Sequence, residues 1–193
     1  MIKKLLLIIY IIALSGVVEA KDILNKCIPA KPYINNYEPA KFNSTNNLLR
    51  KSGIDPLFCG KKILLNLEVV DQNCVPLSDA KIYLWQVGCD KKYPYKPLRP
   101  MADRSLFHRS GVSTFLGSGI STANNLGEAK FLTIYPPALG HEAPHVNIRI
   151  EHKDLGSFQT KIFLKNHELI ESDDYEIMDV RIVTPWENVF RRY

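Results

Sequence analysis

The histidines and tyrosines are the side chains in this sequence that could hold a metal ion or move a proton. Two of the five histidines, His141 and His145, lie four residues apart, and His145 begins an alternating segment that continues through Asn147 and Arg149. A single histidine on the outward side of a strand is more often a surface residue than a ligand. Most of the nine tyrosines are expected to be core or rim residues with a hydrogen-bonded hydroxyl. Residue position alone therefore predicts no metal centre.

The first twenty residues have the pattern of a secretory signal peptide. Lys3 and Lys4 precede an apolar run over residues 5–14, and Val18 and Ala20 give a small-residue cleavage pattern. The apolar run is too short to span a bilayer comfortably, and no cysteine follows it closely. We therefore expect a secreted or periplasmic protein with a signal peptide at residues 1–20 and no stable membrane anchor.

The four cysteines, Cys27, Cys59, Cys74 and Cys89, all lie after this segment. An even number of cysteines in an oxidising compartment predicts two disulfides, and the absence of a CxxC spacing disfavours a metal site. Cys74 and Cys89 flank a predicted strand of about eight residues, which separates them by ~26 Å. Bonded cysteines need Cα atoms within roughly 7 Å of each other. A Cys74–Cys89 bond is therefore disfavoured, and the other two connectivities stay open.

Composition and charge exclude two classes of protein. Charged residues make up 23% of the chain and hydrophobic residues 46%, which excludes an intrinsically disordered protein. Without residues 1–20 the formal net charge falls from +5 to +4, because that segment holds two lysines and one glutamate. The basic residues are scattered, so no nucleic-acid partner is expected.

Period-two alternation of apolar and polar residues dominates the chain after residue 60. Such alternation is typical of strands that pack on a core by one face. In the segment after Pro144 it predicts that Val146, Ile148 and Ile150 face the core, while His145, Asn147 and Arg149 share the opposite, outward side. Polar turns separate the strands, and no long helical period is present, so the sequence predicts an all-β fold, an antiparallel β-sandwich. The alternating segments are 63–69, 82–84, 146–151, 158–162 and 180–182.

The segment before the sandwich has a different character. Residues 21–60 are rich in Asn and Pro and weakly periodic, which predicts an irregular N-terminal arm lying over the sandwich domain at 61–193. Residues 91–113 contain three prolines and read as one long loop, a length that usually indicates function or disorder.

Several short motifs between about residues 60 and 150 belong together. They are Leu67–Asp71, Cys74–Ala80, Ile82–Gln86, Phe131–Pro136 and Ala143–Asn147, with Gly117, Thr122 and Gly127 between them and Tyr93 following the Trp85-Gln86 pair. In this order they resemble the intradiol ring-cleavage dioxygenases, the family of catechol and protocatechuate dioxygenases. The spacing from Trp85-Gln86 to Tyr93, together with the Pro144-His145 strand, is the most specific part, because the other motifs also occur in prealbumin-like sandwiches.

The resemblance implies a ferric centre. The family holds Fe(III) with two tyrosinates and two histidines, since a hard anionic oxygen stabilises the higher oxidation state. Tyr93 and His145 match two of these metal ligands. Tyr135 and His141 are the residues that could substitute for the others. The sequence departs from the family pattern at Leu139 (second tyrosine), Asn147 (second histidine) and Glu142 (an arginine), so the iron site is degenerate.

The resemblance and the departures from it leave two alternative functions. The first is a non-haem ferric dioxygenase that cleaves a small aromatic diol of the catechol type between its two hydroxylated carbons. The alternative is a secreted, non-catalytic binding or surface module on the same sandwich. In either case the resemblance predicts that Tyr93 and His145, 52 residues apart in sequence, approach within ~6 Å, as ligands of one ion do.

Overall fold

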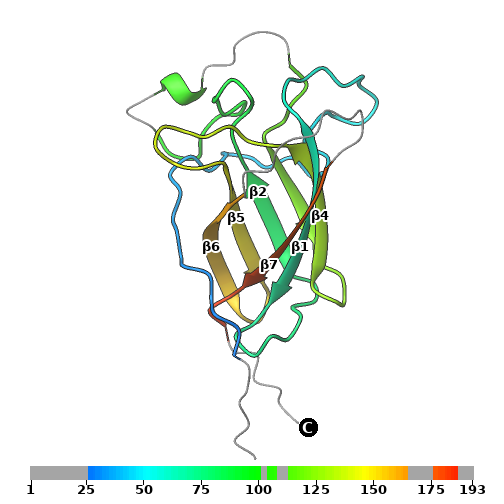
Figure 1. Cartoon of the computed structure of the whole chain (residues 1–193), viewed down its shortest axis with the longest axis vertical. Helices are drawn as coiled ribbons and strands as arrows, with labels where there is room; N and C mark the ends of the chain where they lie inside the picture. The colour runs from blue at the N-terminus through cyan, green and yellow to red at the C-terminus, as the bar shows by residue number, and fades with distance from the viewer. Residues whose placement is uncertain (1–25, 101–103, 108–112, 165–175, 187–193) are drawn as a thin grey trace, which may run out of the picture.

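The computed structural model describes residues 26–100, 104–107, 113–164 and 176–186. These residues form seven strands and one short 3-10 helix over Ser105–Phe107, arranged as two sheets face to face (Figure 1). The predicted signal peptide lies outside the described residues. The strands are β1 (Lys62–Val70), β2 (Lys81–Trp85), β3 (Ser118–Thr122), β4 (Glu128–Ile134), β5 (His145–His152), β6 (Gly156–Phe163) and β7 (Glu176–Val183).

The two sheets have the strand orders β4-β1-β7 and β3-β2-β5-β6. This confirms the predicted β-sandwich, with one correction: β7 pairs with β1 in parallel, whereas every other pair of strands is antiparallel. Hairpin connections force neighbouring strands to run in opposite directions. β7 follows β6 of the opposite sheet, so no hairpin fixes its direction relative to β1.

The main core lies between the sheets and is built from one side of each strand. Ile63, Leu65 and Leu67 of β1 face Ile82 and Leu84 of β2 across this layer, and all are fully buried. Val146, Ile148 and Ile150 of β5 belong to the same core, which confirms their predicted direction. Each such side chain contributes about 1.5–3 kcal/mol through burial.

The opposite side of β5 is also buried, which corrects the prediction of an outward, solvent-facing row. His145 is only 5% exposed and Asn147 is fully buried, although both point away from the main core. The N-terminal arm covers this face. Its backbone pairs along β6 through Tyr33 N and Gln159 O (2.8 Å), and Figure 1 shows it running beside that strand. Alternation of one strand cannot reveal cover supplied by a distant segment.

The arm is fastened at several points. Cys27–Cys74 and Cys59–Cys89 are disulfide-bonded, so both predicted disulfides form and Cys74 does not bond Cys89. Between them, the Glu38 carboxylate pairs with the Arg149 guanidinium of β5, which also lies over the Tyr83 ring. The arm is therefore held to both sheets by covalent and electrostatic contacts.

Gly119 marks a close approach of the arm to β3. A Cβ atom added there would lie 2.3 Å from the Thr45 carbonyl oxygen and 2.8 Å from Leu48 Cδ1. The Ile120 amide of the same strand donates to that Thr45 oxygen (2.9 Å). Only glycine leaves room for this contact between β3 and the arm.

Gly119→Ala should therefore destabilise the fold by about 1–3 kcal/mol, because the new methyl group overpacks the contact. Chemical denaturation of the oxidised protein measures the change. Thr122→Ala, exposed at the end of the same strand, is the control and should stay within about 0.5 kcal/mol of wild type. Equal stability of the two variants would contradict the close approach of the arm.

Candidate functional site

Tyr93 lies in the loop after β2 and is the centre of an aromatic cluster. Its ring stacks on Tyr37 of the arm (centroids 5.3 Å apart) and on Phe107 (5.4 Å), and it is only 1% exposed. The aromatic cluster consists of Trp85, Val87 and Tyr93, with Tyr37, Phe42, Tyr95, Leu106, Phe107 and Leu139 packed against them. Leu139, which the sequence resemblance matches to the family's second tyrosine, packs against this cluster.

Burial raises the pKa of the Tyr93 hydroxyl well above its usual value. The side-chain amides of Asn35 and Asn147 interact with this hydroxyl and oppose the shift, whereas the negative charge of Glu142 adds to it. Tyr93 is therefore a neutral phenol at physiological pH. The same interaction places it beside Asn147, two residues from His145 on the same side of β5. A direct approach of Tyr93 to His145 stays a prediction.

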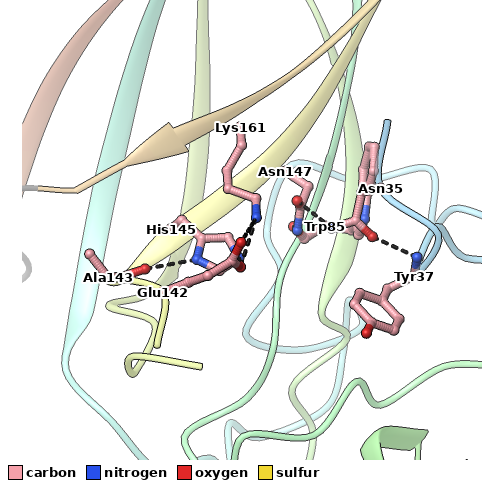
Figure 2. Close-up of polar contacts among 8 residues, drawn as sticks. All are labelled: Asn35, Tyr37, Trp85, Glu142, Ala143, His145, Asn147 and Lys161. Carbon is pink, nitrogen blue, oxygen red and sulfur yellow. Dashed lines mark hydrogen bonds and ion pairs between the residues drawn. The ribbon is translucent and has the colours of Figure 1, made fainter. Parts of the chain in front are cut away.

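Asn147 is held in a buried network of amides (Figure 2). The Asn35 amide donates to Asn147 Oδ1 (2.5 Å), and Asn147 Nδ2 donates to the Trp85 carbonyl (3.3 Å). Asn35 Oδ1 in turn accepts the Tyr37 backbone amide (2.5 Å). The carbonyl oxygen of Asn147 is the only atom of that side chain suited to a metal, and it already accepts a hydrogen bond.

His145 is buried at the start of β5 with one ring nitrogen fixed. Nδ1 lies 2.8 Å from the Ala143 carbonyl oxygen, so it carries the proton, and Nε2 faces Glu142 Oε2 at 3.5 Å (Figure 2). Burial lowers the pKa of the imidazole; the Ala143 carbonyl opposes this, the positive charge of Lys161 adds to it, and Glu142 opposes it. His145 is therefore neutral at pH 7, with Nε2 as an acceptor.

Lys161 brings a buried positive charge to the same place. Its Nζ lies 2.7 Å from both Glu142 oxygens and 3.9 Å from the centre of the Tyr33 ring, and its side chain is only 4% exposed. On β6, Lys161 is directly opposite Asn147 in the strand register. Because this ammonium group is paired with Glu142, the carboxylate beside His145 has less negative charge to offer a metal cation.

The predicted substitute ligands have other surroundings. Tyr135 is half-buried at the end of β4, where burial and then Glu176 raise the pKa of its hydroxyl. With Pro136, Pro137 and Pro144 it lines a separate hollow. His141 is exposed on a tight turn closed by hydrogen bonds between Leu139 and Glu142. Their recruitment as ligands stays a prediction.

Sequence reasoning missed two residues that define this site. Asn35 lies in the irregular arm, and no periodicity connects it with Asn147. Lys161 stood in an alternating segment as an ordinary outward-facing residue, and only the register of β5 with β6 brings it to Asn147.

The described residues contain no group of three or more His, Cys, Asp or Glu side chains that could hold a metal ion. Within the same ranges, no helix is long and apolar enough to cross a membrane.

The lowered pKa of His145 predicts how stability depends on pH. The folded state binds the proton at His145 more weakly than the unfolded state does. His145 therefore costs no stability above about pH 6.5, and the free energy of unfolding decreases as the pH drops below that value. His145→Gln should flatten this acid-side decrease, as measured by denaturation at a series of pH values. The matched control is exposed His141→Gln, which should keep the wild-type profile. An unchanged profile for His145→Gln would contradict the buried neutral imidazole.

Comparison with known proteins gives close sequence relatives. No known protein-family model matches the chain. A protein of Rickettsia typhi named "Putative dioxygenase" is 44% identical over 161 residues, covering 83% of this chain and 77% of that protein. A Rickettsia felis protein with the same name is 42% identical over 166 residues, covering 86% of this chain and 79% of the relative.

Solved structures share the fold at lower identity. The intradiol ring-cleavage dioxygenase of Tetranychus urticae superposes with a TM-score of 0.51 and 23% identity, over 72% of this chain and 66% of that one. The 3-chlorocatechol 1,2-dioxygenase of Rhodococcus opacus gives 0.53 and 14% identity, over 89% and 76% of the two chains. The chain thus shares the fold of the intradiol dioxygenases, and by its likeness to the Rickettsia proteins it belongs to their family, the proteins named "Putative dioxygenase".

Proposed function

We propose that this chain is an exported member of the family that has lost the ferric ring-cleavage site and acts as a non-catalytic binding or surface module. The observation that carries the proposal is the buried pairing of Asn35 with Asn147. By the sequence resemblance, Asn147 stands where the family has a histidine ligand, and its pairing with Asn35 engages the oxygen that a metal would need. Breaking it would leave buried amide groups unpaired, at a cost of about 1–3 kcal/mol each.

The donor set does not fit ferric iron bound in the family's manner. Tyr93 and His145 offer one oxygen and one nitrogen. Leu139 offers no donor atom, the Asn147 oxygen already accepts a hydrogen bond, and the Glu142 carboxylate next to His145 is paired with the Lys161 ammonium. Two protein ligands hold a hard trivalent cation poorly, and we therefore derive no catalytic step through iron.

Export is part of the proposal. Two disulfides persist in an oxidising compartment, and residues 1–20 have the pattern of a signal peptide. Both observations support a role in the periplasm or outside the cell.

A second function is favoured by His145 itself. Its Nδ1 donates to a backbone carbonyl, and its Nε2 is left as an acceptor, which is the arrangement of most metal-bound histidines. If the Asn35 contact opened, Tyr93 and His145, supplemented by Tyr135 or His141, would form the ligand set of a dioxygenase for a small aromatic diol.

One experiment separates the two functions. The oxidised chain without residues 1–20 is loaded with ferric iron, freed of excess metal, and examined for iron content, visible absorbance and catechol-dependent oxygen uptake. We expect little bound iron, no tyrosinate-to-iron colour and no ring cleavage. Stoichiometric iron with a visible band that Tyr93→Phe abolishes, together with oxygen uptake, would contradict the proposal and establish the second function.

The reverse substitutions give the matching gain-of-function test. Leu139→Tyr and Asn147→His restore the missing donors, and Asn35→Ala with Lys161→Ala removes the groups that occupy and charge the site. The combined variant should bind close to one iron per chain and become coloured. A control that keeps Asn35 and Lys161 but carries the two restored donors should bind less iron. If the combined variant folds and stays colourless, loss of these donors is not what excludes iron.

A further inference from the structure

A cavity separate from the aromatic cluster lies beside the loop that carries Tyr93. It has a volume of about 270 Å³, and the Cys59–Cys89 disulfide forms part of its wall. We call it the disulfide pocket; its apolar lining comes from Leu57, Phe58, Pro94, Phe115 and Ile134. Phe115 and Ile134 are buried and belong to the main core, whereas Leu57 is 56% exposed. The pocket therefore extends from the surface down to the core between the sheets.

The walls of the disulfide pocket are fixed by three sets of bonds. Leu57 exchanges hydrogen bonds with Thr114, through Leu57 N to Thr114 Oγ1 (2.9 Å) and Thr114 N to Leu57 O (2.6 Å). The disulfide joins the arm to the loop after β2. Gly88 N donates to Lys92 O (2.8 Å) and closes that loop. A wall fixed in advance spares a ligand the entropic cost of ordering it.

The pocket is separate from the family's site. Lys92 and Pro94 line it, but Tyr93 between them turns into the aromatic cluster. His145, Asn147 and Lys161 are not part of its wall. Occupancy of the pocket is thus independent of whether iron binds near His145, and the inference goes beyond the proposed function.

Size and lining indicate the ligand. A dry apolar cavity of about 150 Å³ already binds benzene. The disulfide pocket is larger, has two phenylalanine rings and a proline on its wall, and adds the polar side chains of Asp90 and Ser113, while the Lys92 ammonium donates to the Ser105 carbonyl (2.7 Å). Apolar walls with a few polar groups are typical of small-molecule sites. We propose that the disulfide pocket binds a one-ring aromatic molecule that carries a hydroxyl group, with the ring between Phe115 and Pro94 and the hydroxyl toward the polar side chains.

Gly88 provides a variant that blocks the pocket. A Cβ atom there would lie 2.9 Å from Asp90 Oδ1 and 3.6 Å from Phe115 Cδ1, two atoms of pocket-lining residues, so a larger side chain projects into the cavity. The nearest of these atoms, Asp90 Oδ1, accepts the Lys92 backbone amide (3.1 Å), and this exposed side chain must shift to make room. Gly88→Leu should fill the pocket without breaking the hydrogen bond from its backbone amide to Lys92.

The test is a titration of the oxidised chain with phenol, followed by NMR of the methyl groups. We expect saturable shifts of the Ile134 methyl groups and intermolecular NOEs between them and the phenol ring. Gly88→Leu should weaken phenol binding at least about tenfold. Leu57→Ala, which trims an exposed wall, should weaken it several-fold, whereas its matched control Leu126→Ala (61% exposed, in the β3–β4 turn) should bind like wild type.

Three outcomes would overturn the inference. The first is the absence of saturable Ile134 shifts up to the solubility of phenol. The second is wild-type affinity in both Gly88→Leu and Leu57→Ala, with folding checked by denaturation. The third is a set of NOEs confined to Tyr93 and Tyr37, which would place phenol in the aromatic cluster. None of these outcomes bears on iron binding, so the proposed function is tested separately.

Discussion

The hydrogen bond between Asn35 and Asn147 is the contact on which the outer face of the β3-β2-β5-β6 sheet depends. Asn35 is also the acceptor for the Tyr37 amide, so the same side chain that meets β5 sets the backbone of the arm. The Tyr37 ring then stacks on Tyr93, which fixes the loop after β2. The side-chain amides of Asn35 and Asn147 are buried, and leaving one of them unpaired would cost about 1–3 kcal/mol. The arm, the strand and the loop therefore keep their positions together.

The basic side chains on the outer face of the β3-β2-β5-β6 sheet are paired with carboxylates. Lys161 pairs with Glu142, and Arg149 pairs with Glu38 and Glu151. The side chains of Glu142 and Glu151 are 44% and 40% exposed, so of these pairs only Arg149–Glu38 is largely buried, and removing a partner there costs the most. The Glu142 carboxylate beside His145 is already engaged by Lys161, which leaves less negative charge to attract a trivalent cation. The departures from the family pattern at Asn147 and Glu142 are thus parts of one arrangement, in which the arm and β6 supply the compensating groups.

The fold was more predictable than the site, for a physical reason. Alternation in β1 and β5 reports local burial, and it gave the direction of Val146, Ile148 and Ile150 correctly. Strand length was enough to disfavour Cys74–Cys89. The parallel β1–β7 pair and the cover over His145 depend on contacts between residues over a hundred positions apart, such as Asn35 with Asn147. Short-range patterns carry no information on those pairings, and Lys161 looked like any polar strand residue until its register was known.

The positions of the disulfides have a consequence for the order of assembly. Both bonds join residues within the first 89 of the chain, whereas the face that the arm covers comes from β5 and β6, residues 145–163. Neither cross-link involves β5 or β6, so both can form before those strands meet the arm. Closing chain segments with separations of 47 and 30 residues removes loop entropy worth about 4 kcal/mol each in the chain-entropy account. When β5 and β6 arrive, they dock against an arm already tethered nearby, so an oxidising environment acts as an assembly factor for this face of the sandwich.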